Sequence, residues 1–165
     1  MNQWSCLPKA VSSLLAPQTT FEQLIQAIGH DGSEILNHNM VEPLNRRAFS
    51  LGEVASAATR LGEPLMVLDV LEQLPDGREI ELFSKEQIRP FLKDCVLYGI
   101  VNDQLHAVHC KELWIFDPNG TAYSLGEFKI YSIIFRANHQ CIAQLKNICQ
   151  LPHVVREISA TSEST

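Results

Sequence analysis

The sequence lacks the charge and hydrophobic patterns of several large protein classes. Its 165 residues contain 13 Lys and Arg against 19 Asp and Glu, with a formal net charge of -6 and no block rich in Lys or Arg. This balance excludes a nucleic-acid binder that relies on a basic surface. No apolar run is long enough to span a bilayer, and the N-terminus has no charged segment followed by a hydrophobic run. We therefore expect no nucleic-acid or membrane partner and a cytoplasmic location.

The sequence also lacks the motifs of common cofactor sites. Its five cysteines are odd in number and show no CxxC spacing, so they predict neither a disulfide framework nor a zinc ribbon. There is no GxGxxG, no GxxxxGK[ST] and no GxSxG, so a nucleotide site or a serine-hydrolase elbow has no support. We therefore predict no cofactor and no metal.

The composition is that of one folded domain. With 45% hydrophobic and 19% charged residues, a chain of this length can bury a core of its own. We assign residues 1–153 to this single domain. The last residues, 154–165, end in a small and polar stretch, which predicts a flexible C-terminal tail.

The first third of the chain has helical patterns. Leu7, Val11 and Leu14 recur at helical spacing, and the pattern stops before Pro17. Two further helices, over 21–28 and 50–61, each follow a capping-box pattern and each end at a glycine. Between them, residues 30–49 carry Gly, Pro and several Asn without a steady period, which predicts an ordered loop.

After residue 63 the hydrophobic period changes to that of strands. Short runs rich in β-branched and aromatic residues are separated by turn residues, at 64–71, 95–101, 106–111, 113–117 and 129–137. They predict an antiparallel sheet of four or five strands. We expect a helix over 84–94 that Pro90 ends early, and one or two helical turns over 141–149. Helices followed by antiparallel strands make an α+β domain.

Cys6 is the first residue with catalytic chemistry. It lies at the start of the first predicted helix, where unpaired N–H groups and the helix dipole favour a thiolate over a thiol. A small buried residue at a helix start is an equally good interpretation from position alone. A catalytic role therefore depends on whether the chain supplies a base.

His106 and Asp117 can supply the base and its orienting group. A catalytic cysteine needs an imidazole, and the imidazole needs an acceptor that holds its other nitrogen. His106 opens one predicted strand, Asp117 closes the next, and a turn at 111–112 would make the two strands antiparallel. We therefore expect His106 and Asp117 to be cross-strand neighbours.

His109 is a second histidine on the same predicted strand. Alternation along the strand puts His106 on one face and His109 on the other, so only one of them can face the Cys6 helix. We assign that role to His106 and expect His109 to lie at the surface or on the opposite face. The same alternation argues against a metal site built from His106, His109 and Cys110, for which no second ligand pair has zinc spacing.

The order of these motifs resembles the papain-like cysteine peptidase superfamily. Cys-x-Pro-x-Ala at a helix start, then His-Ala-Val in one strand and Phe-Asp-Pro-Asn-Gly after the next, is most similar to the bacteriocin-processing peptidase branch and its small phage and bacterial relatives. The resemblance implies a papain-like fold with Cys6 as nucleophile, His106 as general base and acid, and Asp117 as orienting residue. It also implies a protein or peptide substrate, and for a phage-type protein a host protein as the target.

Two positions depart from the pattern of that family. Its members carry a glutamine upstream of the cysteine that helps to bind the oxyanion, and here Gln3 is the candidate, although it lies closer to Cys6 than is usual. Asn2 or Ser5 are alternatives. Leu7 also replaces the glycine that normally follows the cysteine.

Two functions from different classes follow. The first is a thiol hydrolase that acts on a peptide, an isopeptide or a glutamine amide, with deamidation and acyl transfer left open by the same residues. The second is a catalytically inactive papain-like fold that binds a protein or inhibits a host factor through the loop 30–49. The presence of all three residue types in order favours the first, and the changes at Gln3 and Leu7 favour the second.

Overall fold

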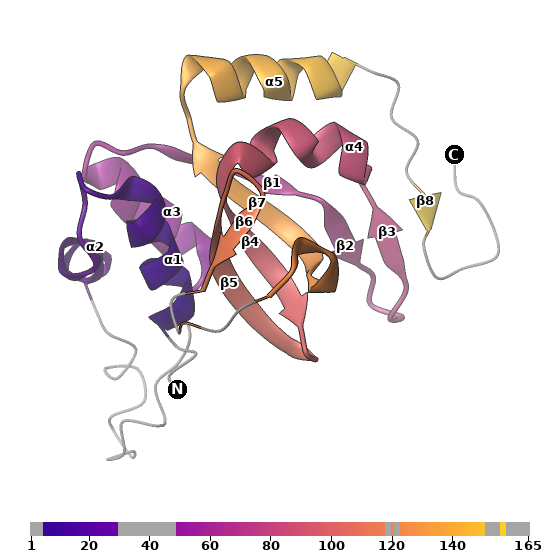
Figure 1. The fold of residues 1–165 in the computed structure, drawn as a ribbon, viewed down its shortest axis with the longest axis horizontal. Helices are drawn as coiled ribbons and strands as arrows, with labels where there is room; N and C mark the ends of the chain where they lie inside the picture. The colour runs from indigo at the N-terminus through magenta and orange to yellow at the C-terminus, as the bar shows by residue number, and fades with distance from the viewer. Residues whose placement is uncertain (1–4, 30–48, 118–119, 121–122, 151–155, 158–165) are drawn as a thin grey trace.

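A computed structural model describes residues 5–29, 49–117, 120, 123–150 and 156–157. Within these residues, the protein is an α+β domain in which three helices precede the first strand and two more lie among the strands that follow (Figure 1). The helices are α1 (Cys6–Leu15), α2 (Phe21–Ile28), α3 (Leu51–Arg60), α4 (Lys85–Ile88) and α5 (His139–Gln150), with 3₁₀ turns η3 (Arg89–Lys93) and η4 (Leu125–Glu127). The strands are β1 (Leu65–Asp69), β2 (Leu71–Gln73), β3 (Glu79–Glu81), β4 (Asp94–Val101), β5 (Gln104–Lys111), β6 (Trp114–Phe116), β7 (Lys129–Arg136) and β8 (Arg156–Glu157).

The main sheet has five antiparallel strands in the order β1-β7-β4-β5-β6. The prediction of an antiparallel sheet of four or five strands is confirmed. The strands β4, β5 and β6 follow one another in a meander because tight turns join them. Asn102 and Asp103 form one turn with φ of 51° and 61°, and Glu112 and Leu113 form the next with φ of 52° and 69°. Positive φ at both central residues is the geometry that a two-residue hairpin needs.

Helices α2 and α3 form where the capping patterns predict them, and α1 forms where the hydrophobic spacing predicts it. The Thr20 side chain accepts from the Gln23 N–H at the start of α2, and Ser50 accepts from the Glu53 N–H at the start of α3. Each acceptor satisfies an N–H group that has no partner inside its helix. Gly29 ends α2 with a φ of 94°, a conformation that glycine adopts without a steric penalty.

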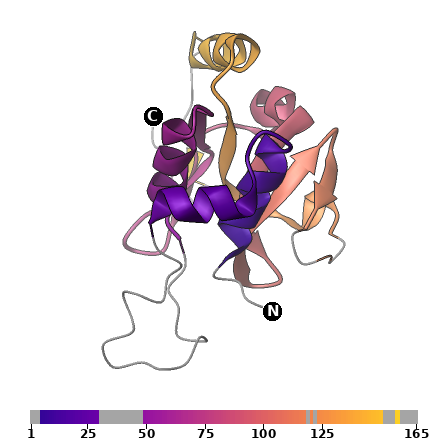
Figure 2. The same ribbon diagram turned by 90° about the vertical axis from the view of Figure 1, so that its left-hand side faces the viewer.

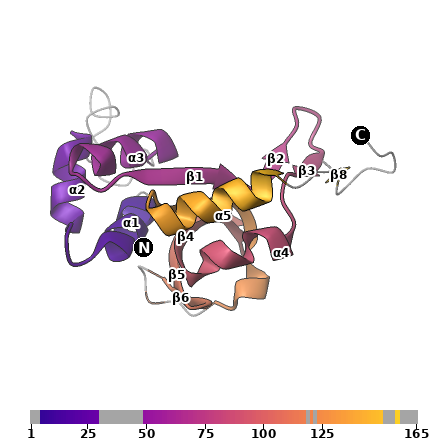
Figure 3. The same ribbon diagram turned by 90° about the horizontal axis from the view of Figure 1, so that it is seen from above.

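The sheet separates two hydrophobic cores. One core packs α1, α2 and α3 against the face that carries Val96, Ala107 and Ile134. Figure 2 shows these three helices grouped in front of the sheet. The other core packs η3 and α5 against the opposite face, which carries Leu97 and Val108. Figure 3 shows α5 crossing above the strands on that side, with α4 beside it. Strand β5 therefore has side chains in both cores.

Four predictions about the strands and helices need correction. The run 64–71 is two strands, because Val70 donates to Tyr131 O at 2.7 Å and accepts from Leu82 N at 2.8 Å, which takes β2 out of the main sheet. Strand β2 pairs with β3 and β8 in a second, three-stranded sheet that the sequence pattern does not indicate, since β3 is the acidic stretch 79–81. In addition, α5 is 12 residues long rather than one or two turns.

The fourth correction concerns the turn between β5 and β6. Lys111 pairs with Trp114 in the β5–β6 register, so the turn residues are Glu112 and Leu113 rather than Lys111 and Glu112. The helix expected over 84–94 does end early, at Ile88, and continues as the 3₁₀ turn η3 that contains Pro90. The loop 30–48 lies outside the described residues, as do 158–165 of the expected tail, whereas 156–157 form β8.

Candidate active site

Cys6 is the first residue of α1 and lies against strand β5. Its side chain is only 7% exposed and belongs to the core between the helices and the sheet. Ala10, one turn further along α1, and Ala107 of β5 are fully buried in the same core. These two small side chains let the helix approach the strand closely. The start of α1 is therefore fixed next to the beginning of β5.

Burial raises the pKa of the Cys6 thiol above its ordinary value of 9.0. The backbone N–H groups of Ala107 and Leu7 act in the opposite direction and lower this pKa, whereas the negative charge of Asp117 raises it. The Leu7 N–H is one of the donors at the start of α1 that have no carbonyl partner within the helix. Because desolvation outweighs these donors, the resting form of Cys6 is the thiol.

His106 and Asp117 are joined by a hydrogen bond. The distance between His106 Nε2 and Asp117 Oδ1 is 3.0 Å, and both side chains are almost completely buried. His106 also contacts the Tyr123 ring edge to face, with 6.0 Å between the ring centroids. A buried carboxylate on one ring nitrogen fixes the orientation of the imidazole and favours a proton on that nitrogen.

The strand register explains how these two residues meet. Residues 109–111 of β5 pair with residues 114–116 of β6, so the continued register would place Asp117 opposite Val108. His106 lies two residues before Val108 and on the same face of the strand, which makes the contact with Asp117 diagonal. His106 and Asp117 are therefore in contact across the strands, as expected. Because the turn lies one residue later than predicted, the contact is diagonal rather than direct.

The second ring nitrogen of His106 has no hydrogen-bond partner in the described part of the chain. His106 Nδ1 is buried, and neither the Cys6 thiol nor any other described group bonds to it. An unpartnered buried nitrogen costs about 1–3 kcal/mol, so such an atom needs a functional explanation. Hydrogen bonds of catalytic groups are often long in the absence of substrate and shorten when it binds.

The three expected catalytic residues are therefore arranged as follows. His106 and Asp117 are in direct contact. Cys6 lies beside the backbone N–H of Ala107, which directly follows His106, and is close enough to Asp117 for that charge to raise its pKa. His106 itself shares its strand face with Val108, whose side chain is in the core away from α1. The thiol thus meets β5 at its backbone, at the end of the strand where His106 lies.

The oxyanion assignment rests on backbone groups in the described residues. Gln3 and Asn2 lie outside them. Ser5 is buried and precedes α1 without making a side-chain capping bond to the helix. The N–H groups of Cys6 and Leu7 both lower the pKa of the Cys6 thiol, and donors that favour negative charge at this sulfur are also placed to favour it on an adjacent oxygen.

His109 does not occupy the place that the sequence pattern predicts. It is 6% exposed rather than a surface residue, and it is the histidine that faces the Cys6 helix. His109 Nδ1 lies 2.7 Å from Ser13 Oγ of α1, and Nε2 lies 2.7 Å from Asp94 Oδ1 of β4. The alternation of the two histidines is thus right and the assignment of faces is wrong. Nothing in the local sequence shows which face of β5 the helix covers.

A further group of neighbours was missed from the sequence. Tyr98 of β4 pairs with Ala107 in the sheet, and both burial and the nearby Cys6 charge raise its pKa. Gly99 pairs with His106, and a Cβ at this position would lie 2.0 Å from Lys129 O. The β4–β7 register shifts at this point. Aligning residues 95–101 with residues 104–111 as an antiparallel pair would have shown that Tyr98 and Gly99 lie next to Ala107 and His106.

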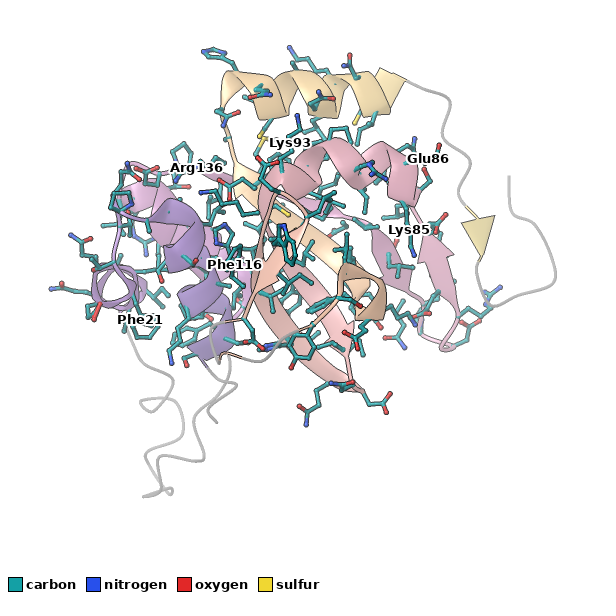
Figure 4. The ribbon with its side chains drawn as sticks, in the orientation of Figure 1. Phe21, Lys85, Glu86, Lys93, Phe116 and Arg136 are labelled. Carbon is teal, nitrogen blue, oxygen red and sulfur yellow. The ribbon has the colours of Figure 1, made fainter. Side chains whose placement is uncertain are left out.

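The surface next to the site carries exposed aromatic side chains. Trp114 and Phe116 of the edge strand β6 are 74% and 53% exposed. Phe116 pairs with His109 and therefore lies on the α1 face of the sheet, with 6.0 Å between the two ring centroids (Figure 4). Strand β6 leads directly into Asp117. The aromatic pair therefore lies on the edge strand that ends next to Asp117 in the chain.

The described residues offer neither a metal cluster nor a membrane-spanning helix. There, no three His, Cys, Asp or Glu side chains are close enough together to hold a metal ion. Within those same ranges, every helix is too short or too polar to cross a membrane. Comparison of the whole sequence with protein families finds no family model that matches, and comparison with curated proteins finds no match either. The function must be argued from the site itself.

Proposed function

We propose that this protein is a papain-like thiol hydrolase in which Cys6 is the nucleophile, His106 the general base and acid, and Asp117 the residue that orients the imidazole. The substrate is the amide of a peptide, an isopeptide or a glutamine side chain. For a phage-type protein the target is a host protein. Support for this function comes from the site and from the resemblance of the sequence motifs.

One observation carries the proposal. The His106 imidazole is bound to Asp117 through Nε2 and has a buried, unpartnered Nδ1, at the end of β5 that the Cys6 thiol contacts. His109 differs in that both of its ring nitrogens have partners, Ser13 and Asp94. A ring nitrogen without a partner can accept the proton of a nucleophile, which is what a general base requires.

The raised pKa of Cys6 decides the order of the steps. Because the resting group is a thiol, its proton passes to His106 Nδ1 as the sulfur attacks the carbonyl carbon and forms the C–S bond. Asp117 stabilises the imidazolium that results. His106 then gives the proton to the leaving amine as the C–N bond breaks. Water adds to the thioester, one of its protons passes through His106, and the carboxylic acid and the thiol are released.

The experiment measures the rate of Cys6 alkylation by iodoacetamide against pH, with mass spectrometry to locate the label. Cys149 is a free, exposed cysteine and serves as the internal reference. Because His106 would remove the thiol proton as the sulfur attacks, we expect Cys6 to react about tenfold faster than Cys149 at neutral pH. His106→Ala should remove this advantage and shift the pH profile of Cys6 upward.

His109→Ala is the matched control. It removes a buried imidazole and its carboxylate contact from the same strand, but not the proposed base. It should leave the Cys6 pH profile in place. The proposal fails if Cys6 reacts no faster than Cys149 at neutral pH, or if His106→Ala leaves its pH profile unchanged.

The burial of Cys6 favours a second candidate function, that of an inactive papain-like fold that binds a protein. The thiol is 7% exposed, its pKa is raised, and it makes no hydrogen bond to His106 Nδ1. The exposed Trp114 and Phe116 of the edge strand β6 offer a contact surface. A Cys6 that is alkylated more slowly than Cys149 throughout the pH range, in the parent protein and in His106→Ala alike, would favour this function.

A further inference from the structure

A second nucleophile lies on α1, at the opposite end of its contact with β5. Ser13 is exposed to solvent, and its Oγ lies 2.7 Å from His109 Nδ1. His109 is buried, and its Nε2 lies 2.7 Å from Asp94 Oδ1. A hydroxyl, an imidazole and a carboxylate are thus joined in one line from three elements, α1, β5 and β4.

The two hydrogen bonds define the role of the imidazole. The carboxylate of Asp94 accepts from Nε2–H, which leaves Nδ1 as the acceptor for the Ser13 hydroxyl, an assignment made from the hydrogen-bond partners. This is the tautomer in which an imidazole can remove a proton from a hydroxyl. Asp94 would stabilise the imidazolium that forms.

Ser13 and His109 are displaced from Cys6 and His106 by similar distances along their elements. Ser13 is seven residues after Cys6, which is about 10 Å along a helix. His109 is three residues after His106, which is also about 10 Å along a strand. The helix and the strand therefore bring a second nucleophile to a second histidine, without the GxSxG motif by which serine hydrolases are recognised in sequence.

Ser12 provides a comparison within the same helix. Its hydroxyl donates to Lys9 O at 2.9 Å, which is the ordinary bond of a helix serine to a preceding carbonyl. Ser13 makes no such bond in the described structure and is held by His109 instead. The two adjacent serines thus have the same backbone environment but differ in whether a base is present.

We propose that Ser13 is a second nucleophile, activated by His109 and Asp94, that accepts acyl groups from activated esters and thioesters. Its Oγ forms a C–O bond to the acyl carbon while the hydroxyl proton passes to His109 Nδ1. The bond to the leaving alkoxide or thiolate breaks, and that group takes the bonding electron pair. The proton then passes from His109 to solvent or to the leaving group.

The class of acyl donor follows from the place of Ser13 in the helix. Ser13 lies in the third turn of α1, where backbone N–H groups bond to carbonyls within the helix and are not free to bind an oxyanion. Amides need that stabilisation, whereas esters and thioesters with good leaving groups react without it. For the same reason the acyl-serine forms faster than it hydrolyses, so Ser13 is a site of lasting acylation.

The experiment uses p-nitrophenyl acetate on the Cys6→Ala protein, so that its outcome is independent of the proposed function. Acetyl groups on α1 are located by peptide fragmentation and timed separately for Ser13 and Ser12. Base assistance contributes about 10²-fold or more, so we expect Ser13 to be acetylated at least about 100-fold faster than Ser12. His109→Gln should reduce the Ser13 rate to that of Ser12.

Asp94→Asn is the second variant, in case His109→Gln does not fold. The Asp94 side chain is 44% exposed, so this change keeps the shape of a surface residue while removing the carboxylate. It should lower the Ser13 rate and leave the Ser12 rate unchanged, with folding checked by circular dichroism. The proposal is overturned if Ser13 is acetylated no faster than Ser12, or if a folded His109→Gln or Asp94→Asn protein retains the full Ser13 rate.

Discussion

Strand β5 carries two histidines, and each is bound to an aspartate. They differ in whether the second ring nitrogen has a hydrogen-bond partner. At one end, His106 is bound to Asp117 and its Nδ1 has no partner in the described structure. At the other end, His109 is bound to Asp94 and its Nδ1 is bound to Ser13. The nucleophile at the first end is the nearly buried Cys6, and the nucleophile at the second is the exposed Ser13.

The difference shows that the same histidine–carboxylate pair occurs once beside a buried thiol and once beside an exposed hydroxyl. Ser13 and His109 satisfy each other's hydrogen bonds, and their chain connects α1, β5 and β4. This connection aligns α1 on the sheet and thus holds Cys6 at the other end of the contact. The unpartnered Nδ1 of His106 adds no such stability, and structures retain such costs mainly where function requires them.

Replacing each of the two aspartates by asparagine should give the largest difference between the His106 end and the His109 end. The quantity compared is the rate of Cys6 alkylation. Asp117→Asn removes the group that holds His106 in its tautomer, and we expect the rate of Cys6 alkylation at neutral pH to fall about 10²-fold. Asp94→Asn, at the other end, should change that rate by less than about twofold. Equal effects of the two substitutions on Cys6 would show that the ends are not distinct.

A substitution in the neighbouring strand should perturb only the His106 end. Gly99→Ala would place a Cβ 2.0 Å from Lys129 O, directly opposite His106, and we expect it to lower the free energy of unfolding by about 1–3 kcal/mol. Gly52→Ala in α3 meets no atom within 4 Å and should stabilise the protein by about 0.5–1 kcal/mol. Chemical denaturation of both variants measures the difference, and a neutral Gly99→Ala would contradict this packing.

The smallest expected effect is a pH dependence at the Cys6 end. The pKa of Cys6 is raised on folding, so the folded state holds this proton more tightly than the unfolded state. Its contribution to stability is complete below the ordinary thiol pKa of 9.0 and is lost as the pH rises through the folded pKa. The unfolding free energy should therefore fall more steeply above about pH 9 in the parent protein than in Cys6→Ala.

Urea unfolding at several pH values from neutral to alkaline measures this slope. The contributions of Cys95, Cys110 and Cys141 also change with pH, but they are common to both proteins and cancel in the comparison. Parallel curves for the parent protein and Cys6→Ala would mean that folding does not raise the Cys6 pKa. A steeper fall of the unfolding free energy in Cys6→Ala than in the parent protein would mean that folding lowers the Cys6 pKa.

Much of the local structure could be predicted from short stretches of sequence. The helices α2 and α3 begin at Thr20 and Ser50 because each serine or threonine caps an N–H group three residues ahead. These interactions involve only neighbouring residues, so no knowledge of the fold is needed. The break at Val70 was not predictable in this way, because its partners are Tyr131 on β7 and Leu82, which directly follows β3.

By itself, the sequence determined that Cys6 begins a helix, that His106 and His109 alternate on one strand, and that Asp117 follows the next strand. Each of these depends on the helical or strand period and on turn residues nearby in the chain. Only the tertiary structure decided that α1 covers the His109 face of β5, which gives Ser13 to His109 and leaves His106 Nδ1 without a described partner. The physical reason is that Ala10 and Ala107, nearly a hundred residues apart, must pack together before the helix has a position on the strand.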